Sequence, residues 1–362
     1  MSEVVDGSRV DLRCSLRTRA GGVVPVSTAA PAVTQVLVET PLPWPSDLAG
    51  TDLHRAVADA AGPGARVHGV VPRPDRPAGE VAVVVHAAPP GPFTRYRRAT
   101  AVASVSPSAS GSSAARSASA SSAARSASAS ASVDAIVEVV ADLVAGLAAR
   151  ADVPERRDPA VDLLVCTHGS RDRCCGAFGS NLAAWAERSL DVDVWRASHL
   201  GGHRFAPTAL HLPTGTTWAW LEPDDLAAVV RRTRPPAEMI DRYRGSAAVG
   251  LPAAQVLEAE AFARVGWAWL ETGRDVVVHD EPVPGREWDI EVAGAGRRWR
   301  ATIVRTGSID QPACGRPEAG PKTDPVWEVL DLTEDVLPEG VVREDGVRED
   351  GRPEDTLRED TG

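Results

Sequence analysis

Three of the chain's five cysteines lie within ten residues, in the stretch CTHGSRDRCC that begins at Cys166. Eight residues separate Cys166 from Cys175, and Cys174 lies directly before the latter. Two histidines follow in SHLGGHRF, where three residues separate His199 from His203. Thiolates and imidazoles are the ligands that zinc and some iron–sulfur clusters take. The spacing therefore predicts a metal site formed by Cys166, Cys175, His199 and His203.

Spacing alone leaves the kind of metal open. The H-x3-H spacing falls within the zinc-finger range, whereas C-x8-C is wider than usual for zinc. A cluster held by two cysteines and two histidines has a precedent in Rieske centres. Cys174 is an alternative to Cys175 as the second thiolate, and His168 is a further candidate ligand. A thiol–disulfide enzyme is another hypothesis, although the C-x-x-C motif typical of one is absent.

Charged residues and two distant cysteines surround this motif in the sequence. We expect the run Arg171–Arg173 to form salt bridges within its loop. Arg204 is expected either to contact the metal centre or an anionic partner, or to pair with a surface carboxylate. Cys14 and Cys314 are remote in sequence from the cluster, and each is interpreted as a core thiol or a redox accessory.

The elements around the motif predict how it is positioned. VDLLVC reads as a strand that ends at Cys166, GSNLAAWAERSL as a helix, and VDVWRAS as a strand that leads to His199. TALHLP and TTWAWLE then read as a hairpin, and PDDLAAVVRR as a closing helix. The order βαβ followed by ββα over residues 133–234 predicts a thioredoxin-like ferredoxin domain. Loops after such strands are the usual place for chemistry in an α/β sheet.

The rest of the chain divides by composition. Residues 10–100 predict an α/β half, either a second thioredoxin-like unit or a βαββ unit, and residues 235–333 predict an α+β extension. Residues 101–132 are mostly Ser and Ala and predict a disordered linker, after which Ser132 is expected to cap a helix. Residues 334–362 hold eleven acidic and four basic residues and predict a disordered tail. The fold class expected is thus α/β.

Composition narrows the classes of partner. The net charge is −11 with no basic region, which makes nucleic acid a poor partner. No apolar run approaches ~18 residues, so no membrane segment is expected. The N-terminus lacks the pattern of a signal peptide, and the odd, clustered cysteines do not suggest a disulfide framework. We expect a cytoplasmic protein.

Two long motifs carry a family resemblance. LVCTHGSRDRCCGAFG from Leu164 and VWRASHLGGHRFAPTALHLPTG from Val194 resemble the sucrase/ferredoxin-like family, which is related to thioredoxin-like ferredoxins. Weaker matches are CSLRTRAGG at Cys14, LVETPLPWP at Leu37, YRG at Tyr243 and ACGRP at Ala313. The resemblance favours a [2Fe–2S] cluster over zinc, with the four residues of the C-x8-C and H-x3-H motifs as its ligands. It implies an electron-transfer protein, a redox carrier more than a catalyst, with redox donor and acceptor proteins as unknown partners.

Overall fold

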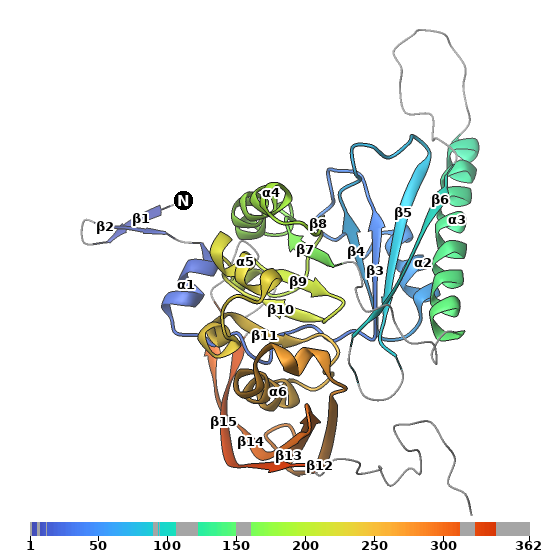
Figure 1. Ribbon diagram of the computed structural model, residues 1–362. Coiled ribbons are helices and arrows are strands. Elements are labelled where there is room, and N and C mark those ends of the chain that lie inside the picture. The colour runs from blue at the N-terminus through green and yellow to red at the C-terminus, as the bar shows by residue number, and fades with distance from the viewer. Residues whose placement is uncertain are drawn as a thin grey trace, which may run out of the picture.

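The structure of this protein is a computed structural model that describes residues 2–5, 8–11, 13–89, 93, 95–105, 122–149, 161–311 and 323–337. These residues form a nine-stranded mixed sheet, a four-stranded antiparallel sheet and a hairpin of β1 (Ser2–Val5) and β2 (Ser8–Asp11). Helices cover both larger sheets (Figure 1). The predicted α/β class is confirmed.

The N-terminal half of the nine-stranded sheet is one strand–helix–strand unit followed by two further strands. Its elements are β3 (Thr34–Glu39), α2 (Asp52–Ala61), β4 (Ala65–Val70), β5 (Glu80–Ala87) and β6 (Arg97–Ser104), after which comes α3 (Ser122–Ala149). Strand β3 is parallel to β4 and antiparallel to β5, which is antiparallel to β6. Figure 1 shows α2 and α3 on the outer side of these strands, where apolar side chains of both helices pack against the sheet.

The C-terminal half repeats this order. Its elements are β7 (Asp162–Cys166), a π-helical turn η1 (Cys175–Gly179), α4 (Ser180–Ser189), β8 (Asp193–Ala197), β9 (Ala209–Leu212), β10 (Thr216–Trp218) and α5 (Pro223–Arg231). Strand β7 is parallel to β8 and antiparallel to β9, which is antiparallel to β10. These are the strands and helices that the hydrophobic pattern predicts. Strand β11 (Tyr243–Ser246) adds an edge beside β10.

The two halves meet along a short seam. Strands β4 and β8 are antiparallel neighbours, and the pair Val70–Ala197 is the one strand register that joins them. Apolar side chains from both halves fill the space between them and include four cysteines. The carboxylate of Asp162 on β7 reaches across the seam, where it accepts hydrogen bonds from His86 Nε2 at 2.8 Å and Arg98 Nε at 2.5 Å. The seam is therefore closed mainly by side chains.

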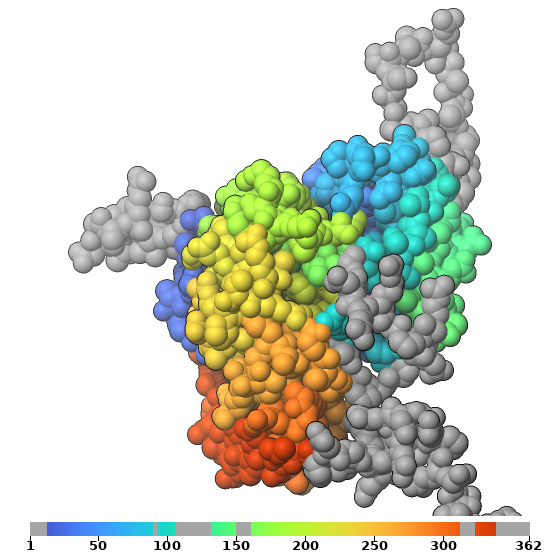
Figure 2. Space-filling view, viewed as in Figure 1, coloured from blue at the N-terminus to red at the C-terminus, as the bar shows by residue number. Residues whose placement is uncertain are grey.

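The C-terminal region packs a helix on its own sheet. Helix α6 (Pro252–Val265) and the 3₁₀ segment η4 (Gly266–Glu271) lie against β12 (Asp275–Val283), β13 (Glu287–Gly294), β14 (Arg297–Asp310) and β15 (Thr323–Val336). Alternate residues of β13 are buried, as expected for a sheet with one covered face. Figures 1 and 2 show this region in contact with the C-terminal half of the nine-stranded sheet. The predicted α+β organisation is present in these residues.

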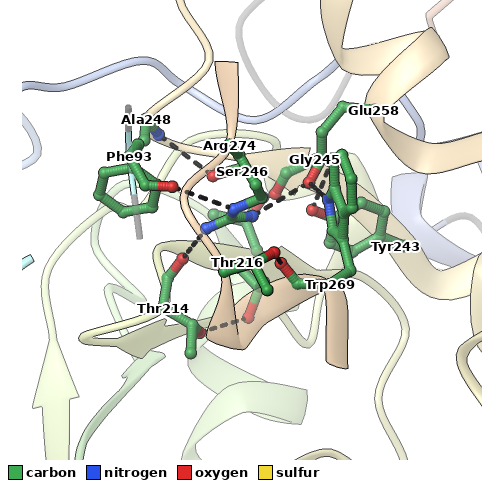
Figure 3. Close-up of polar contacts among 12 residues, drawn as sticks. Phe93, Thr214, Thr216, Tyr243, Gly245, Ser246, Ala248, Glu258, Trp269 and Arg274 are labelled. Atoms are coloured by element: carbon green, nitrogen blue, oxygen red, sulfur yellow. Dashed lines mark hydrogen bonds and ion pairs between the residues drawn. The ribbon is translucent and has the colours of Figure 1, made fainter. Parts of the chain in front are cut away.

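A buried ion pair anchors this region to the rest of the molecule (Figure 3). The guanidinium of Arg274 lies 3.2 Å from the carboxylate of Glu258 on α6, and both side chains are buried. Glu258 also accepts hydrogen bonds from the Tyr243 hydroxyl and the Trp269 indole, each at 2.9 Å. Arg274 exchanges two backbone hydrogen bonds with Phe93 of the N-terminal half. The polar cluster thus links three parts of the chain.

Parts of the predicted linker and tail have regular structure. Strand β6 runs to Ser104, and α3 begins at Ser122, ten residues before the expected cap at Ser132. Residues 106–121 and 338–362 lie outside the described residues, whereas β15 continues to Val336. Among the described helices, none combines the length and the apolar character that a membrane-spanning helix needs.

Candidate functional site

The end of β7 and the start of η1 bring two cysteines together. Cys166 is the last residue of β7, and Cys175 is the first residue of η1. A Cβ atom on Gly179 would collide with the carbonyl oxygen of Cys166. Because glycine has no side chain, the turn that carries Cys175 can pack directly on the end of the strand. Both thiols are fully buried there.

Three of the four predicted ligands converge at this point. The sulfurs of Cys166 and Cys175 and a ring nitrogen of His199 all lie within 4.8 Å of one another. His199 follows β8, and β8 is parallel to β7. Since parallel strands end at the same edge of a sheet, the topology places His199 beside Cys166. The donor set is of the kind that binds soft or borderline transition metals.

The two thiols of this group have opposite proton affinities. A hydrogen bond from the Cys175 thiol holds the pKa of Cys166 well below its usual range, and the nearby ring of His199 lowers it further, against the opposing effect of burial. The same hydrogen bond, together with burial, raises the pKa of Cys175 well above its usual range. The environment therefore favours loss of a proton from Cys166 before Cys175, and a bound metal ion would displace any remaining proton because thiolates are the ligating form.

His203 belongs to a second, adjacent group. Ligand atoms of Cys14, Asp172 and Cys174 lie within 4.8 Å of one another. The Nδ1 atom of His203 is 3.1 Å from an Asp172 carboxylate oxygen and 3.5 Å from the Cys14 sulfur. The rings of His199 and His203 are 6.2 Å apart between centroids. The structure thus brings together Cys166, Cys175 and His199. It places His203, the predicted fourth ligand, beside the carboxylate of Asp172.

The charged residues around the motif have structural partners. One oxygen of Asp172 accepts hydrogen bonds from the backbone amides of Cys174, at 2.8 Å, and of Cys175, at 3.4 Å. Arg171 donates to the carbonyl oxygen of Ser46 at 3.0 Å. Asp172 also lies 3.1 Å from the His203 ring, and neither Arg171 nor Arg173 forms one of the expected salt bridges with a described residue. Arg204 pairs with Asp324, so it has the expected carboxylate partner, but this carboxylate is buried and not at the surface.

A loop of the N-terminal half forms one wall of the site. His168 packs edge-on against Trp44, and its Nε2 lies 2.9 Å from the carbonyl oxygen of Pro45. The Ser170 hydroxyl donates to the carbonyl oxygen of Trp44 at 2.7 Å. Burial lowers the pKa of His168 and keeps its ring neutral. These loop residues belong to the motif LVETPLPWP, which resembles the family. The spacing within this motif does not predict that it contacts the cysteine site.

Of the two cysteines that are distant from the motif in sequence, Cys14 and Cys314, the structure describes only Cys14. Cys14 is the first residue of α1 (Cys14–Ala20) and is fully buried against Cys174. The sequence does not predict this contact, because no residue spacing relates Cys14 to a cysteine cluster more than 150 residues away. Cys314 lies outside the described residues.

Proteins from three yeasts are similar to part of this chain, and all three are called altered inheritance of mitochondria protein 32. The protein of Debaryomyces hansenii is 33% identical over 103 residues, which are 25% of this chain and 38% of the relative. That of Clavispora lusitaniae is 33% identical over 92 residues, 23% of this chain and 34% of the relative. That of Meyerozyma guilliermondii is 31% identical over 103 residues, 25% and 36% of the two chains. The chain thus spans little more than a third of these relatives.

These relatives correct the predicted function. Their name refers to the inheritance of mitochondria and mentions neither an iron–sulfur cluster nor electron transfer. The prediction of an electron-transfer protein that works through a [2Fe–2S] cluster is therefore wrong as a statement of function.

The match to a family model covers far more of the chain. No solved structure gives a significant match. The model described as sucrase/ferredoxin-like matches residues 25–245, which is more than half of the sequence and includes both halves of the nine-stranded sheet. By this match, the chain belongs to the sucrase/ferredoxin-like family.

Proposed function

We propose that this chain is a metal-binding protein whose centre is held by Cys166, Cys175 and His199. The observation that supports the proposal is the convergence of two sulfurs and one ring nitrogen within 4.8 Å of one another. In a tetrahedral zinc site, bonds of about 2.3 Å to sulfur and about 2.0–2.1 Å to nitrogen leave neighbouring ligand atoms roughly 3.5–3.8 Å apart. A small inward movement of these side chains would meet that geometry.

The protein part of the proposed centre is prepared for a cation. The Cys166 thiol has a lowered pKa, which favours the thiolate form that a metal ion binds. The Nδ1 atom of His199 is buried and has no hydrogen-bond partner among the described residues. A metal ion would supply positive charge to balance the thiolates in a site from which water is largely excluded. The backbone around Cys166 and Gly179 holds the two sulfur-bearing segments at a fixed separation.

Several finer expectations remain part of the proposal. His203 stays the predicted fourth ligand, and because its Nδ1 faces Asp172, coordination of the same ion would have to use Nε2. A [2Fe–2S] cluster stays the predicted cofactor. The proposal of metal binding does not depend on this identification. The strand order of each half supports a thioredoxin-like arrangement. A cytoplasmic location is supported by the four free cysteines among the described residues, since thiols persist in reducing compartments.

Metal analysis of anaerobically purified protein tests the proposal. We expect at least one equivalent of a transition metal per chain, and the ratio of zinc to iron and acid-labile sulfide identifies the centre. Cys166→Ala, Cys175→Ala and His199→Ala should each lose most of that metal. Cys14→Ala is the matched control, because Cys14 is an equally buried cysteine outside the group. A folded protein without metal, or equal losses in the control, would contradict the proposal.

A further inference from the structure

A cavity of about 330 Å³ lies between the two halves of the molecule, beside the cysteine site. Its walls include His54 of α2 and Arg66 of β4 on one side, and His168 and Arg171 on the other. Small-molecule pockets begin at about 300 Å³, and this volume equals that of roughly ten water molecules. The space is therefore large enough for a small organic molecule.

The charge of the lining favours an anion. Arg66 forms no ion pair with any carboxylate of the described residues. Arg171 uses one nitrogen, Nη1, to bind the Ser46 carbonyl oxygen, which leaves further N–H groups for a ligand. Asp47 is the single carboxylate in the lining that the structure describes, and its side chain is exposed. Two guanidinium groups thus face the cavity against one solvated carboxylate.

Hydrogen bonds fix which nitrogen of His54 carries the proton. The Thr51 hydroxyl donates its one proton to the carbonyl oxygen of Leu48 at 2.7 Å. At 3.1 Å from His54 Nδ1, the same hydroxyl must therefore accept, which places the ring proton on Nδ1. Burial lowers the pKa of His54 to about 4, so the ring is neutral at pH 7. Its Nε2 is thus a buried lone pair, with no partner among the described residues.

His168 presents a second lone pair of the same kind. Its Nε2 lies 2.9 Å from the Pro45 carbonyl oxygen, and only an N–H group can bind a carbonyl. The proton is therefore on Nε2, and the buried Nδ1 is an acceptor that no described residue satisfies. Buried polar atoms without a partner are rare in folded proteins and call for a ligand or another explanation. The two residues that carry these acceptors, His54 and His168, both belong to the lining of this cavity.

We propose that the cavity binds a small organic anion that also carries a hydroxyl or amino group. Carboxylate or phosphate oxygens of the ligand pair with Arg66 and Arg171. The hydroxyl or amino protons bind His54 Nε2 and His168 Nδ1, the two acceptors that the protein leaves unsatisfied. The proposal goes beyond metal binding and does not depend on a metal at Cys166, because none of these four residues belongs to that group.

Calorimetric titration of the full chain with two matched pairs of probes tests this ligand class. Malate and succinate differ by one hydroxyl group on a dicarboxylate, and glycerol 3-phosphate and propyl phosphate differ by the two hydroxyl groups on a phosphate monoester. In at least one pair, we expect the hydroxylated probe to bind roughly fivefold or more tightly than its partner, as one hydrogen bond predicts. The pair that binds distinguishes a carboxylate from a phosphate ligand. Failure of all four probes to bind at millimolar concentration overturns the proposal.

Substitutions locate the binding. Arg66→Gln should weaken the better probe roughly tenfold or more, since it removes a charged hydrogen-bond donor. Arg55→Gln is the matched control, because Arg55 is an exposed arginine of α2 that pairs with Asp52 and does not line the cavity. His54→Phe should remove the preference for the hydroxylated probe. Equal effects of the two arginine variants overturn the proposal, and unchanged metal content and melting temperature in Arg66→Gln keep it separate from the metal centre.

Discussion

The sulfur of Cys14 lies 3.5 Å from the sulfur of Cys174, although 160 residues separate the two in the sequence. Cys14 is the first residue of α1, and Cys174 directly precedes η1. The contact therefore joins the first helix of the chain's described residues to the loop of the cysteine site. Both side chains are fully buried. A pair of thiols at this distance needs only a small approach to form a bond of about 2.05 Å.

We predict that diamide links Cys14 to Cys174. The two thiols give up two protons and two electrons, which reduce diamide to its hydrazine, and the sulfurs join in a disulfide. A cross-link over 160 residues restricts the unfolded chain and should raise the free energy of unfolding by up to about 5 kcal/mol. Peptide mass mapping without reductant, and chemical denaturation before and after oxidation, measure the two effects.

Cys174→Ser is the control for this cross-link. It should leave Cys14 open to alkylation after diamide treatment and remove the gain in stability. A link from Cys174 to Cys166 or Cys175, with Cys14 still alkylated, would show that the 3.5 Å contact is not the one that reacts.

The adjacent cysteines Cys174 and Cys175 should differ in their effect on metal binding. We predict that Cys175→Ser lowers metal affinity at least tenfold, whereas Cys174→Ser retains the metal, because Cys175 lies with Cys166 and His199 while Cys174 lies with Cys14. Metal content after dialysis against a weak chelator measures both variants. The reverse result would assign the second thiolate to Cys174.

The carboxylate of Asp162 should stabilise the seam between the two halves. Burial raises its pKa, but hydrogen bonds from His86 and Arg98 outweigh this effect and hold the pKa well below its usual range. Asp162→Asn removes one charge of a buried pair and should cost about 3–5 kcal/mol, measured by urea denaturation. Asp193→Asn is the control: Asp193 also lies near Arg98, at 3.8 Å, but is partly exposed and should cost less than about 1 kcal/mol. Equal losses would contradict a special role for the seam.

Buried histidines should make the fold sensitive to acid. Burial lowers the pKa of His211 to about 4, whereas the unfolded chain takes up this proton near pH 6.5. The unfolded state thus binds more protons in this window, so the stabilisation is complete above about pH 6.5 and is lost as the pH falls towards 4. Between pH 7 and pH 5, His211→Asn should reduce the loss by about 2 kcal/mol. Urea midpoints at pH 7, 6 and 5 measure this, with the exposed His279→Asn as control; identical slopes for all three proteins would contradict it.

Local patterns predict the central elements well but not the limits of the Ser/Ala segment. Strand β7 and helices α4 and α5 follow the spacing of their apolar residues closely. The start of α3 could not be predicted, because Ser-rich repeats also satisfy the composition of a linker. What distinguishes the two is packing: Ile136, Val140 and Leu147 of α3 are buried against the sheet. That contact depends on β5 and β6, which lie before the Ser/Ala segment, so the composition of the segment itself does not reveal it.

The site was predictable where its geometry follows from neighbouring strands. Cys166 and His199 end parallel strands, so sequence order alone brings them to one edge. The H-x3-H spacing gives no indication that Nδ1 of His203 faces Asp172, outside the group of Cys166, Cys175 and His199. Gly202 has a φ of +64°, a left-handed conformation that starts a new 3₁₀ turn at His203 and directs this ring to Asp172. Such a turn has no signature in residue spacing.

The repeated strand order of the two halves places different side chains at equivalent positions. The strand that ends at Cys166 in the C-terminal half corresponds to β3 in the N-terminal half, which ends at Glu39. The carboxylate of Glu39 binds Arg76 and backbone amides of the N-terminal half. The same strand end therefore carries a thiol in one half and a carboxylate with structural partners in the other.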